Sequence, residues 1–311
     1  MGSTFTCSRD IREKNPAQIV NAREFSLALF VPFSWALGFV VAKAGLEEFP
    51  PLLLMSIRFA IAALVLVWFV PIPRHCLKDL FWIALVGSTI QYGLTFTGLS
   101  MIDASLAIIV VHLEVPSGVL LAILIFRERP GLLRICGMVV SFLGVVLIAG
   151  LPDTEGQLLA IILTGSGAVI WAVGQIMYKR ISAQLDGFTG IAWLGILAAP
   201  QMLLGSFLFE DGQWEAVKHA TWIGWGSVAY LGLVMTVAGY GVWFTVLRRN
   251  PVSHVMPVLL LLPVFTIAFS VLLLGERPSL GVLLGGLVVL AGVAMIVLAK
   301  STPNSSKAAA H

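Results

Sequence analysis

Residues 92–99, YGLTFTGL, decide the fold because the chain contains their pattern twice, the second time as YGVWFTVL at residues 240–247. Both copies begin with a tyrosine, and the whole chain has only four tyrosines. A chance match between two apolar segments would rarely place such a scarce residue in register. We therefore interpret the two segments as copies produced by an internal duplication, which is the first feature to establish in a new sequence.

Two further pairs of segments support the duplication. The pattern WAxGxxxxK at residues 35–43 returns at residues 171–179. The triplet ERP at residues 128–130 returns at residues 276–278, and this spacing of 148 residues is the one that separates the two tyrosine segments. Two glycines follow each triplet at matching distances, namely Gly137 and Gly144 in the first copy and Gly285 and Gly292 in the second.

The composition excludes a water-soluble fold. Of the 311 residues, 59% are hydrophobic and 11% are charged, against about 25% charged in an ordinary soluble domain. The mean hydropathy is +0.98. The three cysteines have no metal-like spacing, so we expect neither a disulfide framework nor a metal site. We also expect no cofactor and no nucleic-acid partner.

Ten apolar stretches are each long enough to cross a bilayer as a helix, which takes about 20 residues. Backbone polar groups in lipid must bond within the segment, so helices are the only reasonable reading of these runs. We therefore expect an all-α integral membrane fold with spans at residues 25–44, 51–70, 80–99, 104–126, 132–151, 157–178, 188–208, 222–247, 251–274 and 280–298.

The lysines and arginines orient this bundle. With the N-terminus in the cytoplasm, 15 of the 19 basic residues fall on the cytoplasmic side, as the positive-inside rule requires. Both termini are therefore expected in the cytoplasm. We expect a cytoplasmic arm at residues 1–24, a first five-helix repeat at 25–151, a second at 157–298 and a disordered tail at 299–311.

An odd number of spans in each repeat has a topological consequence. After five spans the second copy must enter the membrane from the opposite side, so the two repeats are inverted about an axis in the membrane plane. Inverted repeats are typical of secondary transporters, which bind their substrate near the midplane between the repeats. We expect a small-molecule substrate and alternating access through a central cavity.

The repeated motifs resemble those of a known family. The WAxGxxxxK pattern in the first helix of each repeat, the RERP or GERP segment between the fourth and fifth helices, and Arg58 in the second helix are similar to the drug/metabolite transporter superfamily, EamA type. The resemblance covers residues 25–298, and the chain looks most like the YddG amino-acid exporters. It implies a ten-helix carrier of the inner membrane that exports small metabolites, with aromatic and neutral amino acids as the expected substrates.

Helical spacing selects the residues that line the expected cavity. Polar and aromatic side chains recur at intervals of three and four along several spans, and a polar stripe facing lipid would be costly. Interface belts and plain packing remain alternative roles for the aromatic residues. The candidate substrate-binding residues are Trp35, Gln91, Tyr92, Thr95, His112, Trp171, Gln175, Tyr240 and Trp243.

Charged residues and prolines inside the spans are further candidates. Arg58 and Glu114 are expected to form a structural ion pair, with a role of Glu114 in proton or substrate handling as the alternative. Pro32, Pro116 and Pro263 interrupt spans and are candidate hinges, although packing geometry alone would also explain them.

Other function classes find less support in the sequence. No GxxxxGK[ST] segment is present to favour an ATP-driven pump, and no HExxH, GxSxG or aspartate pair supports an intramembrane enzyme. A channel and an exporter of a drug-like or nucleoside-like solute remain alternatives. The sequence leaves proton coupling, the conformation and the oligomeric state open, and it is compatible with a monomer.

Overall fold

The computed structural model describes residues 22–126, 131–151, 156–181, 184–249 and 256–299. Within these ranges the chain is helical and contains no strand. The expected arm and tail lie almost entirely outside them. The elements of the first half are α1 (Ala22–Gly45), α2 (Pro51–Leu66), η1 (Val67–Phe69), α3 (Leu77–Ala84), η2 (Leu85–Ile90), α4 (Gln91–Met101), α5 (Ala104–Val111), α6 (Glu114–Phe126) and α7 (Leu132–Ala149).

The second half repeats this order. It adds one short exposed helix, α10, between the elements equivalent to α2 and α3. Its elements are α8 (Leu158–Ile181), α9 (Gly187–Phe209), α10 (Gln213–His219), α11 (Trp222–Ala229), η5 (Tyr230–Ala238), α12 (Gly239–Arg249), η6 (Met256–Leu260), α14 (Leu261–Phe269), η7 (Ser270–Leu274) and α15 (Leu280–Leu298).

Nine helical stretches among the described residues are long and apolar enough to cross a membrane. The expected ninth span is present as a shorter apolar helix, Val258–Leu274, because residues 251–255 of that expected span lie outside the described ranges. The two observations together confirm the expected all-α membrane fold with ten spanning segments in two repeats.

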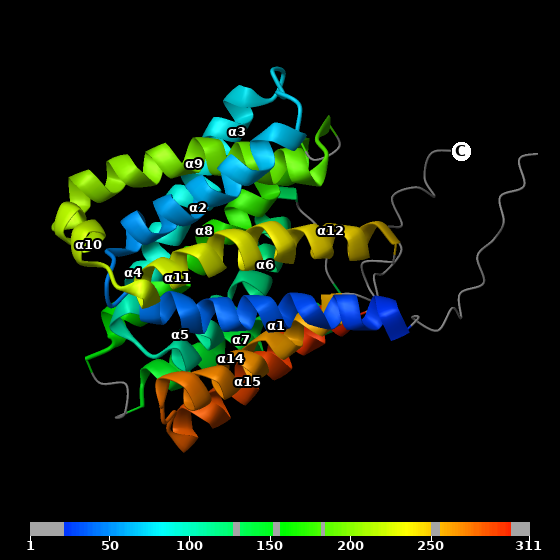
Figure 1. Ribbon diagram of the computed structural model, residues 1–311. Coiled ribbons are helices and arrows are strands. Elements are labelled where there is room, and N and C mark those ends of the chain that lie inside the picture. Colours follow the sequence, from blue (N-terminus) through cyan, green and yellow to red (C-terminus); the bar gives the residue numbers. More distant parts are fainter. Residues whose placement is uncertain (1–21, 127–130, 152–155, 182–183, 250–255, 300–311) are drawn as a thin grey trace, which may run out of the picture.

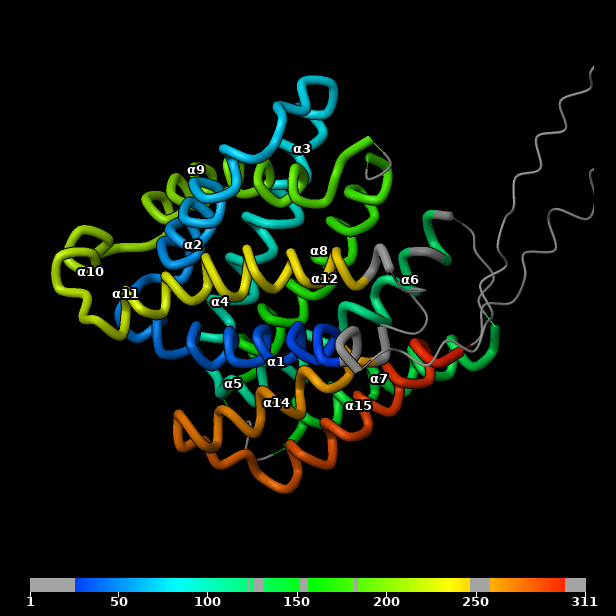
Figure 2. Tube along the Cα trace, turned by 45° about the vertical axis from the view of Figure 1, so that its right-hand side comes forward, coloured from blue at the N-terminus to red at the C-terminus, as the bar shows by residue number. Residues whose placement is uncertain are grey.

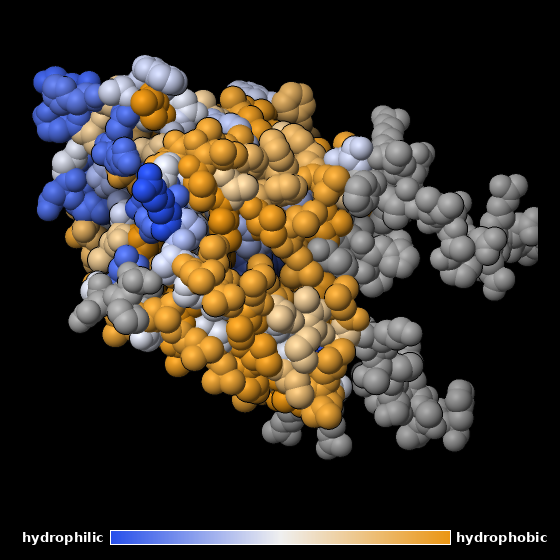
Figure 3. All heavy atoms as spheres, turned by 90° about the horizontal axis from the view of Figure 1, so that it is seen from below, coloured by the Kyte–Doolittle hydropathy of each residue, from blue (hydrophilic) through white to orange (hydrophobic). Residues whose placement is uncertain are grey.

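The surface and the ends of the bundle agree with this reading. α1 begins and α15 ends at the same end of the bundle, on the right in Figure 1. A broad band of apolar side chains crosses the middle of the molecule, and hydrophilic side chains gather at the opposite end, on the left in Figure 3. Highly exposed aromatic residues lie near both ends, as in the aromatic belts of membrane proteins, namely Trp68, Phe69, Phe209, Trp214 and Trp222.

Helices α7 and α15, the last span of each repeat, lie side by side (Figures 1 and 2) and cross through their glycines. A Cβ atom at Gly137 would lie 2.6 Å from the carbonyl oxygen of Gly292, so only glycine fits there. Ser141 donates a hydrogen bond to the carbonyl oxygen of Val289 at 3.3 Å, and these two positions are equivalent at the 148-residue spacing. Contacts between equivalent residues of antiparallel helices require a twofold axis perpendicular to them, so the repeats are inverted.

The third span of each repeat contains a π-helical segment at the same place. η2 leads directly into Gln91 and Tyr92, and η5 ends two residues before Tyr240. A π turn holds one extra residue, which changes the direction of the side chains that follow, and such turns are frequent at functional sites. The wider turns therefore set how the two repeated tyrosines face the interior.

Prolines break the fourth span of each repeat in the same way. α6 begins at Glu114 with Pro116 as its third residue, and α14 begins at Leu261 with Pro263 as its third residue. Proline lacks the amide proton and its ring clashes with the carbonyl four residues earlier, so the helix preceding it ends. Pro32, by contrast, lies inside α1 without interrupting the helix.

Three carboxylates link the repeats at the end that the charge bias assigns to the outside. Each carboxylate follows a helix of one repeat and accepts backbone N–H bonds at the start of a helix of the other, where four amide groups have no partner within the helix. The pairs, with their shortest distances from backbone nitrogen to carboxylate oxygen, are Glu48–Thr221 at 2.6 Å, Glu210–Leu52 at 2.7 Å and Glu276–Ala104 at 2.7 Å.

Candidate functional site

A cavity of about 110 Å³ lies in the interior where helices of both repeats meet. The first repeat contributes side chains from α1, α4, α5, the break between α5 and α6, and Glu114 at the start of α6. The second contributes side chains from α8, η5, α12 and the α14 region. The residues that line it are Trp35, Phe39, Gln91, Tyr92, Thr95, Phe96, Ile108, Val111, His112, Glu114, Trp171, Met235, Tyr240, Leu259 and Leu262.

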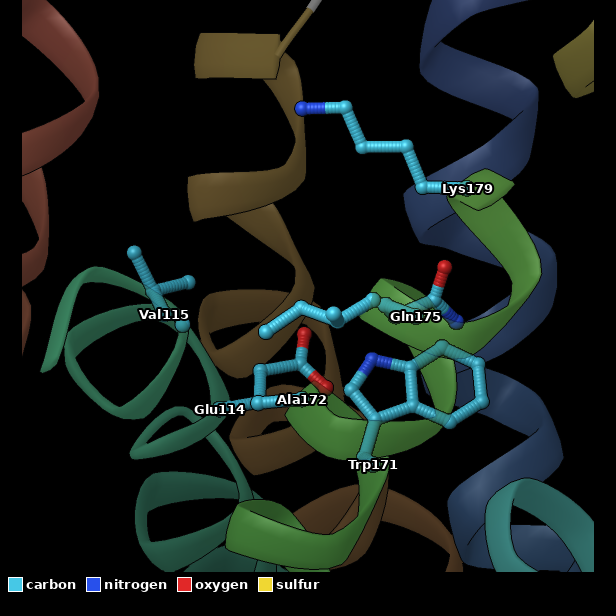
Figure 4. A pocket seen from close by; sticks show the side chains of 8 residues that line it. Glu114, Val115, Trp171, Ala172, Gln175 and Lys179 are labelled. Atoms are coloured by element: carbon cyan, nitrogen blue, oxygen red, sulfur yellow. The ribbon is translucent and has the colours of Figure 1, made fainter. Parts of the chain in front are cut away.

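A second cavity of about 290 Å³ adjoins the first, because Glu114 and Trp171 line both. It runs between α6 and α8 toward Lys179 in the last turn of α8 (Figure 4). Gln175 and Lys179 are exposed, so the cavity opens at this half of α8. By the charge bias this is the cytoplasmic half of the membrane.

The opposite side of the central cavity is closed by packed aromatic rings. Phe39 stacks on Phe96 with ring centres 6.1 Å apart, and Tyr92 stacks on Phe96 at 5.5 Å. One turn farther out, the Lys43 ammonium donates hydrogen bonds to the carbonyl oxygens of Leu99 at 2.9 Å and Ser100 at 3.1 Å. These contacts join α1 to α4, so the described conformation is open toward Lys179 and closed at the other end.

The two tyrosines of the repeated motif come together in this cavity. Tyr92 of the first repeat and Tyr240 of the second both line it. Tyr240 also packs against Trp35, with ring centres 5.0 Å apart, and Tyr92 packs edge-on against Phe59 at 5.1 Å. Equivalent residues therefore meet near the pseudo-twofold axis, as expected for a site at the repeat interface.

Trp243 does not line the cavity, although the sequence suggested that it would. It lies in a separate apolar cluster with Ala28, Val31 and Val246, and its ring centre is 6.1 Å from that of Trp35. Trp35 itself donates from Nε1 to the carbonyl oxygen of Met235 at 3.2 Å. Trp243 thus supports the cavity wall from behind, because helical spacing gives the face of a helix but not the depth of its packing.

Gln91 lines the cavity and carries a buried acceptor without a partner. Its amide nitrogen donates to the Thr95 hydroxyl at 3.0 Å, and both residues are buried. Its Oε1 atom is also buried, and no described group donates a hydrogen bond to it. An unsatisfied buried acceptor costs free energy in a folded protein, and such groups are rare unless a ligand or water uses them.

The expected ion pair between Arg58 and Glu114 is absent from the part of the chain that the structure describes, where the one salt bridge joins His219 to Glu215. Arg58 is fully buried and donates from Nε to the Thr236 hydroxyl at 3.0 Å. Its guanidinium lies 5.2 Å from the ring centre of Tyr92, within cation–π range. The depth of the two residues along their helices allowed a pair, but the ring of Tyr92 and the Thr236 hydroxyl take that place.

Glu114 instead faces the junction of the two cavities. Its carboxylate lies beside the indole of Trp171, and Gln175 stands one turn farther along α8 (Figure 4). No hydrogen bond or ion pair of this carboxylate is found among the described residues. The break before Pro116 starts α6 at Glu114, which places the carboxylate at the first turn of a helix.

His112 lies at the same break. Its Nδ1 donates to the carbonyl oxygen of Ile108 at 2.8 Å, and the ring also approaches the carbonyl oxygen of Leu259. These contacts tie α5 to the start of the α14 region. Among the described residues, no cluster of histidine, cysteine or acidic side chains could hold a metal ion.

Sequence reasoning missed several apolar residues of the site. Phe39 and Phe96 each stand four residues after a predicted cavity residue, Trp35 and Tyr92, and so lie one turn farther along the same face. That spacing was the available signal. Met235 could not be found in this way, because in an apolar span a methionine that lines a cavity cannot be told from one that packs in the core.

The structure is a helical bundle of two inverted halves around a central cavity that is open at one end and closed at the other, as in membrane transporters. The sequence profile of the EamA-like transporter family matches residues 23–150 and again residues 158–298. The chain belongs to the EamA-like transporter family. It is therefore a multi-pass membrane transporter and not an enzyme, and in bacteria such a protein resides in the inner membrane.

Individual relatives agree with the family. A protein of Salmonella typhimurium described as a probable amino-acid metabolite efflux pump is 31% identical over 275 residues, which are 86% of this chain and 92% of the relative. A protein of Escherichia coli with the same description is 30% identical over 276 residues, 86% of this chain and 92% of the relative. The transporter YvbV of Bacillus subtilis is 29% identical and covers 94% of this chain and 96% of its own length.

A solved crystal structure has the same fold. It superposes with a TM-score of 0.58 at 20% identity, and the match covers 87% of this chain and 96% of that one.

Proposed function

We propose that this transporter exports amino acids with apolar or aromatic side chains from the cytoplasm, by alternating access through the central cavity. The observation that carries the proposal is the cavity lining, in which Trp35 and Tyr92 of the first repeat face Trp171 and Tyr240 of the second. Broad aromatic walls suit an apolar side chain, and the few polar groups suit the charged end of an amino acid. The printed descriptions of two relatives as amino-acid metabolite efflux pumps support the same substrate class.

The described conformation fits one end state of such a cycle. A solute from the cytoplasm enters between α6 and α8 past Lys179 and reaches Trp171. The rings of Phe39 and Phe96 and the Lys43 bonds close the way out. In the other end state the two repeats exchange their conformations, which opens the outer end and closes the Lys179 end.

Counterflow in proteoliposomes tests this function. Vesicles loaded with unlabelled L-phenylalanine are expected to accumulate labelled L-phenylalanine without ATP, and a panel of amino acids in the loading solution reports the specificity. A channel gives no counterflow, and ATP dependence would contradict a carrier driven by gradients. Counterflow with a drug-like or nucleoside-like solute but with none of the amino acids would contradict amino acids as the substrate class and favour that solute instead.

Truncation of the cavity walls gives the residue-level test. Trp171→Ala and Tyr240→Ala are each expected to reduce counterflow of L-phenylalanine at least tenfold, because each removes a large part of the wall. Trp222→Ala, at an exposed position outside both cavities, is a matched control of the same chemistry and should transport as the wild type does. A retained elution profile shows that the variants are folded. Normal transport by both cavity variants would contradict the placement of the substrate in this cavity.

A further inference from the structure

Three hydrogen-bond donors of the central cavity are committed to protein partners, whereas two acceptors are not. Trp35 donates to the Met235 carbonyl, His112 donates to the Ile108 carbonyl, and the Gln91 amide donates to Thr95. The buried Oε1 atom of Gln91 has no donor, and none is found for the Glu114 carboxylate among the described residues. The lining thus has vacant acceptors.

The charged side chains of the lining also favour a cationic group of the substrate over an anionic one. Glu114 is the one carboxylate among the described residues around the central cavity, and no lysine or arginine lines it. Arg58 is buried behind the ring of Tyr92 and is held by Thr236. Lys179 lies at the exposed mouth of the adjoining cavity. A cation therefore meets an acidic side chain inside the cavity, whereas a substrate carboxylate finds no basic side chain in that lining.

Aromatic faces add to this preference. Trp35, Trp171, Tyr92 and Tyr240 border the same space, and the negative face of an aromatic ring attracts an ammonium group, most strongly where water is excluded. A carboxylate has the opposite interaction with these faces. Hydrogen bonds to charged groups are also stronger than those between neutral groups.

We infer that Glu114 and Gln91 Oε1 form a recognition centre for the ammonium group of the substrate, and that the cavity requires this group but not the α-carboxylate. The inference rests on the proposed function and narrows it. Primary amines with an apolar or aromatic body, including those that lack a carboxylate, belong to the substrate class. N-acylated amino acids and simple carboxylic acids do not.

Four related probes test the inference on the purified full-length protein in detergent. The measurement is ligand-induced thermal stabilisation by L-phenylalanine, phenethylamine, 3-phenylpropionate and N-acetyl-L-phenylalanine. Phenethylamine is expected to stabilise the protein as well as L-phenylalanine does. The two probes without a free amine are expected to need at least tenfold higher concentrations for the same shift, which corresponds to about 1.4 kcal/mol of binding free energy. Equal stabilisation by 3-phenylpropionate and phenethylamine would overturn the inference.

Substitutions assign the effect to the two residues. Glu114→Gln keeps the shape of the side chain and is expected to weaken phenethylamine binding at least tenfold, and Gln91→Leu to weaken it by a smaller factor. Glu215→Gln, which removes an exposed carboxylate in α10, is the matched control and should bind as the wild type does. The double variant Glu114→Gln with Gln91→Glu returns a carboxylate to the cavity and is expected to recover part of the binding. Unchanged amine binding in a folded Glu114→Gln protein would also overturn the inference.

The two proposals fail separately. Selective stabilisation by amines without any counterflow would leave the recognition centre in place and contradict the transport function. Counterflow of amino acids combined with equal binding of amines and carboxylic acids would support the transport function and contradict the recognition centre. A Glu114→Gln variant that does not fold leaves the four-probe comparison on the wild type to decide.

Discussion

Thr236 is the polar partner that allows Arg58 to remain buried at the repeat interface. Its hydroxyl accepts from Arg58 Nε at 3.0 Å and donates to the carbonyl oxygen of Leu231 at 2.8 Å. Thr236→Val leaves a buried guanidinium without this acceptor, which is expected to cost about 1–3 kcal/mol of stability. The measurement is the melting temperature of the detergent-purified protein.

Thr245→Val provides the control for this substitution. Thr245 donates within its own helix, to the carbonyl oxygen of Gly241 at 2.8 Å, and no hydrogen bond from it to a charged side chain is found among the described residues. The melting temperature should fall clearly more for Thr236→Val than for Thr245→Val. Equal losses would show that Arg58 does not depend on the hydroxyl.

At the scale of residues, the sequence predicts which face of a helix a side chain lies on but not which residues pack against that face. Periodicity selected Trp35, Tyr92, Trp171 and Tyr240, and the structure brings these four rings to one cavity, because their spacing marks one face of each helix. Spacing cannot show what stands opposite that face. For this reason periodicity does not separate Trp243, which lies behind the wall, from residues in the wall. It also does not show that Tyr92 covers Arg58.

At the scale of elements, Glu48 connects the end of α1 to the start of α11. The side-chain hydroxyl of Thr221 donates to this carboxylate at 2.5 Å and its backbone N–H at 2.6 Å, and these bonds lower the pKa of Glu48 below its ordinary value of 4.5. A carboxylate with a lowered pKa in the folded state contributes stability above the pKa of the unfolded chain. That contribution disappears as the pH falls through the folded-state pKa.

A comparison of Glu48→Gln with the wild type at two pH values tests this cap. The variant is expected to melt below the wild type at pH 7. The difference is expected to shrink as the pH falls from about 4.5 through the lower pKa of the folded state, below which the wild-type carboxyl group is protonated as well. Glu47→Gln, which alters the adjacent carboxylate, is the control. A difference that stays constant with pH would show that charge at Glu48 does not act through the cap.

The glycine crossing of α7 and α15 makes a second prediction about elements. Gly137→Ala places a methyl group against the Gly292 carbonyl, and because the neighbour is backbone it cannot move aside cheaply. Overpacking of this kind is expected to cost about 1–3 kcal/mol. Gly226→Ala in α11, where a Cβ atom meets nothing within 4 Å, is the helical control and should melt at or above the wild-type temperature. A harmless Gly137→Ala would exclude the close crossing.

Elements were predictable where the sequence carries a chemical signal. The breaks before Pro116 and Pro263 follow from the geometry of proline, whereas Pro32 shows that the same residue can sit within a helix. The π-helical segments η2 and η5 have no such signal, because one extra residue in a turn is decided by how the neighbouring helices pack.

At the scale of the whole molecule, the charge bias and the open cavity predict which side gives access to the site. Gln175 lies in the cavity that opens at the Lys179 end, and Lys218 lies in α10 at the opposite end. The test uses the two variants Gln175→Cys and Lys218→Cys. In a Cys-free background, a membrane-impermeant thiol reagent is expected to label the first in inside-out vesicles and the second in right-side-out vesicles. Labelling of both from the same side would contradict the orientation and the access path.

The whole architecture was the most predictable level, because a duplication with an odd number of spans has few geometric solutions. Three motif pairs and the hydropathy of the chain were enough to expect two inverted halves, and the α7–α15 crossing has that symmetry. The direction in which the cavity opens was not available from the sequence. Both end states of an inverted repeat satisfy the same hydrophobic pattern.

The meeting of Ser141 with Val289 has a consequence for transport itself. When two inverted halves exchange conformations, a contact between non-equivalent positions is replaced by the contact between the two residues equivalent to them in the other half. A contact between two equivalent positions is replaced by itself. If transport uses the proposed exchange of conformations, the α7–α15 seam keeps the same residues together in both end states. It would serve as the stationary pivot of the carrier, so that a covalent cross-link placed there should leave turnover intact, whereas one placed between α1 and α4 should arrest it.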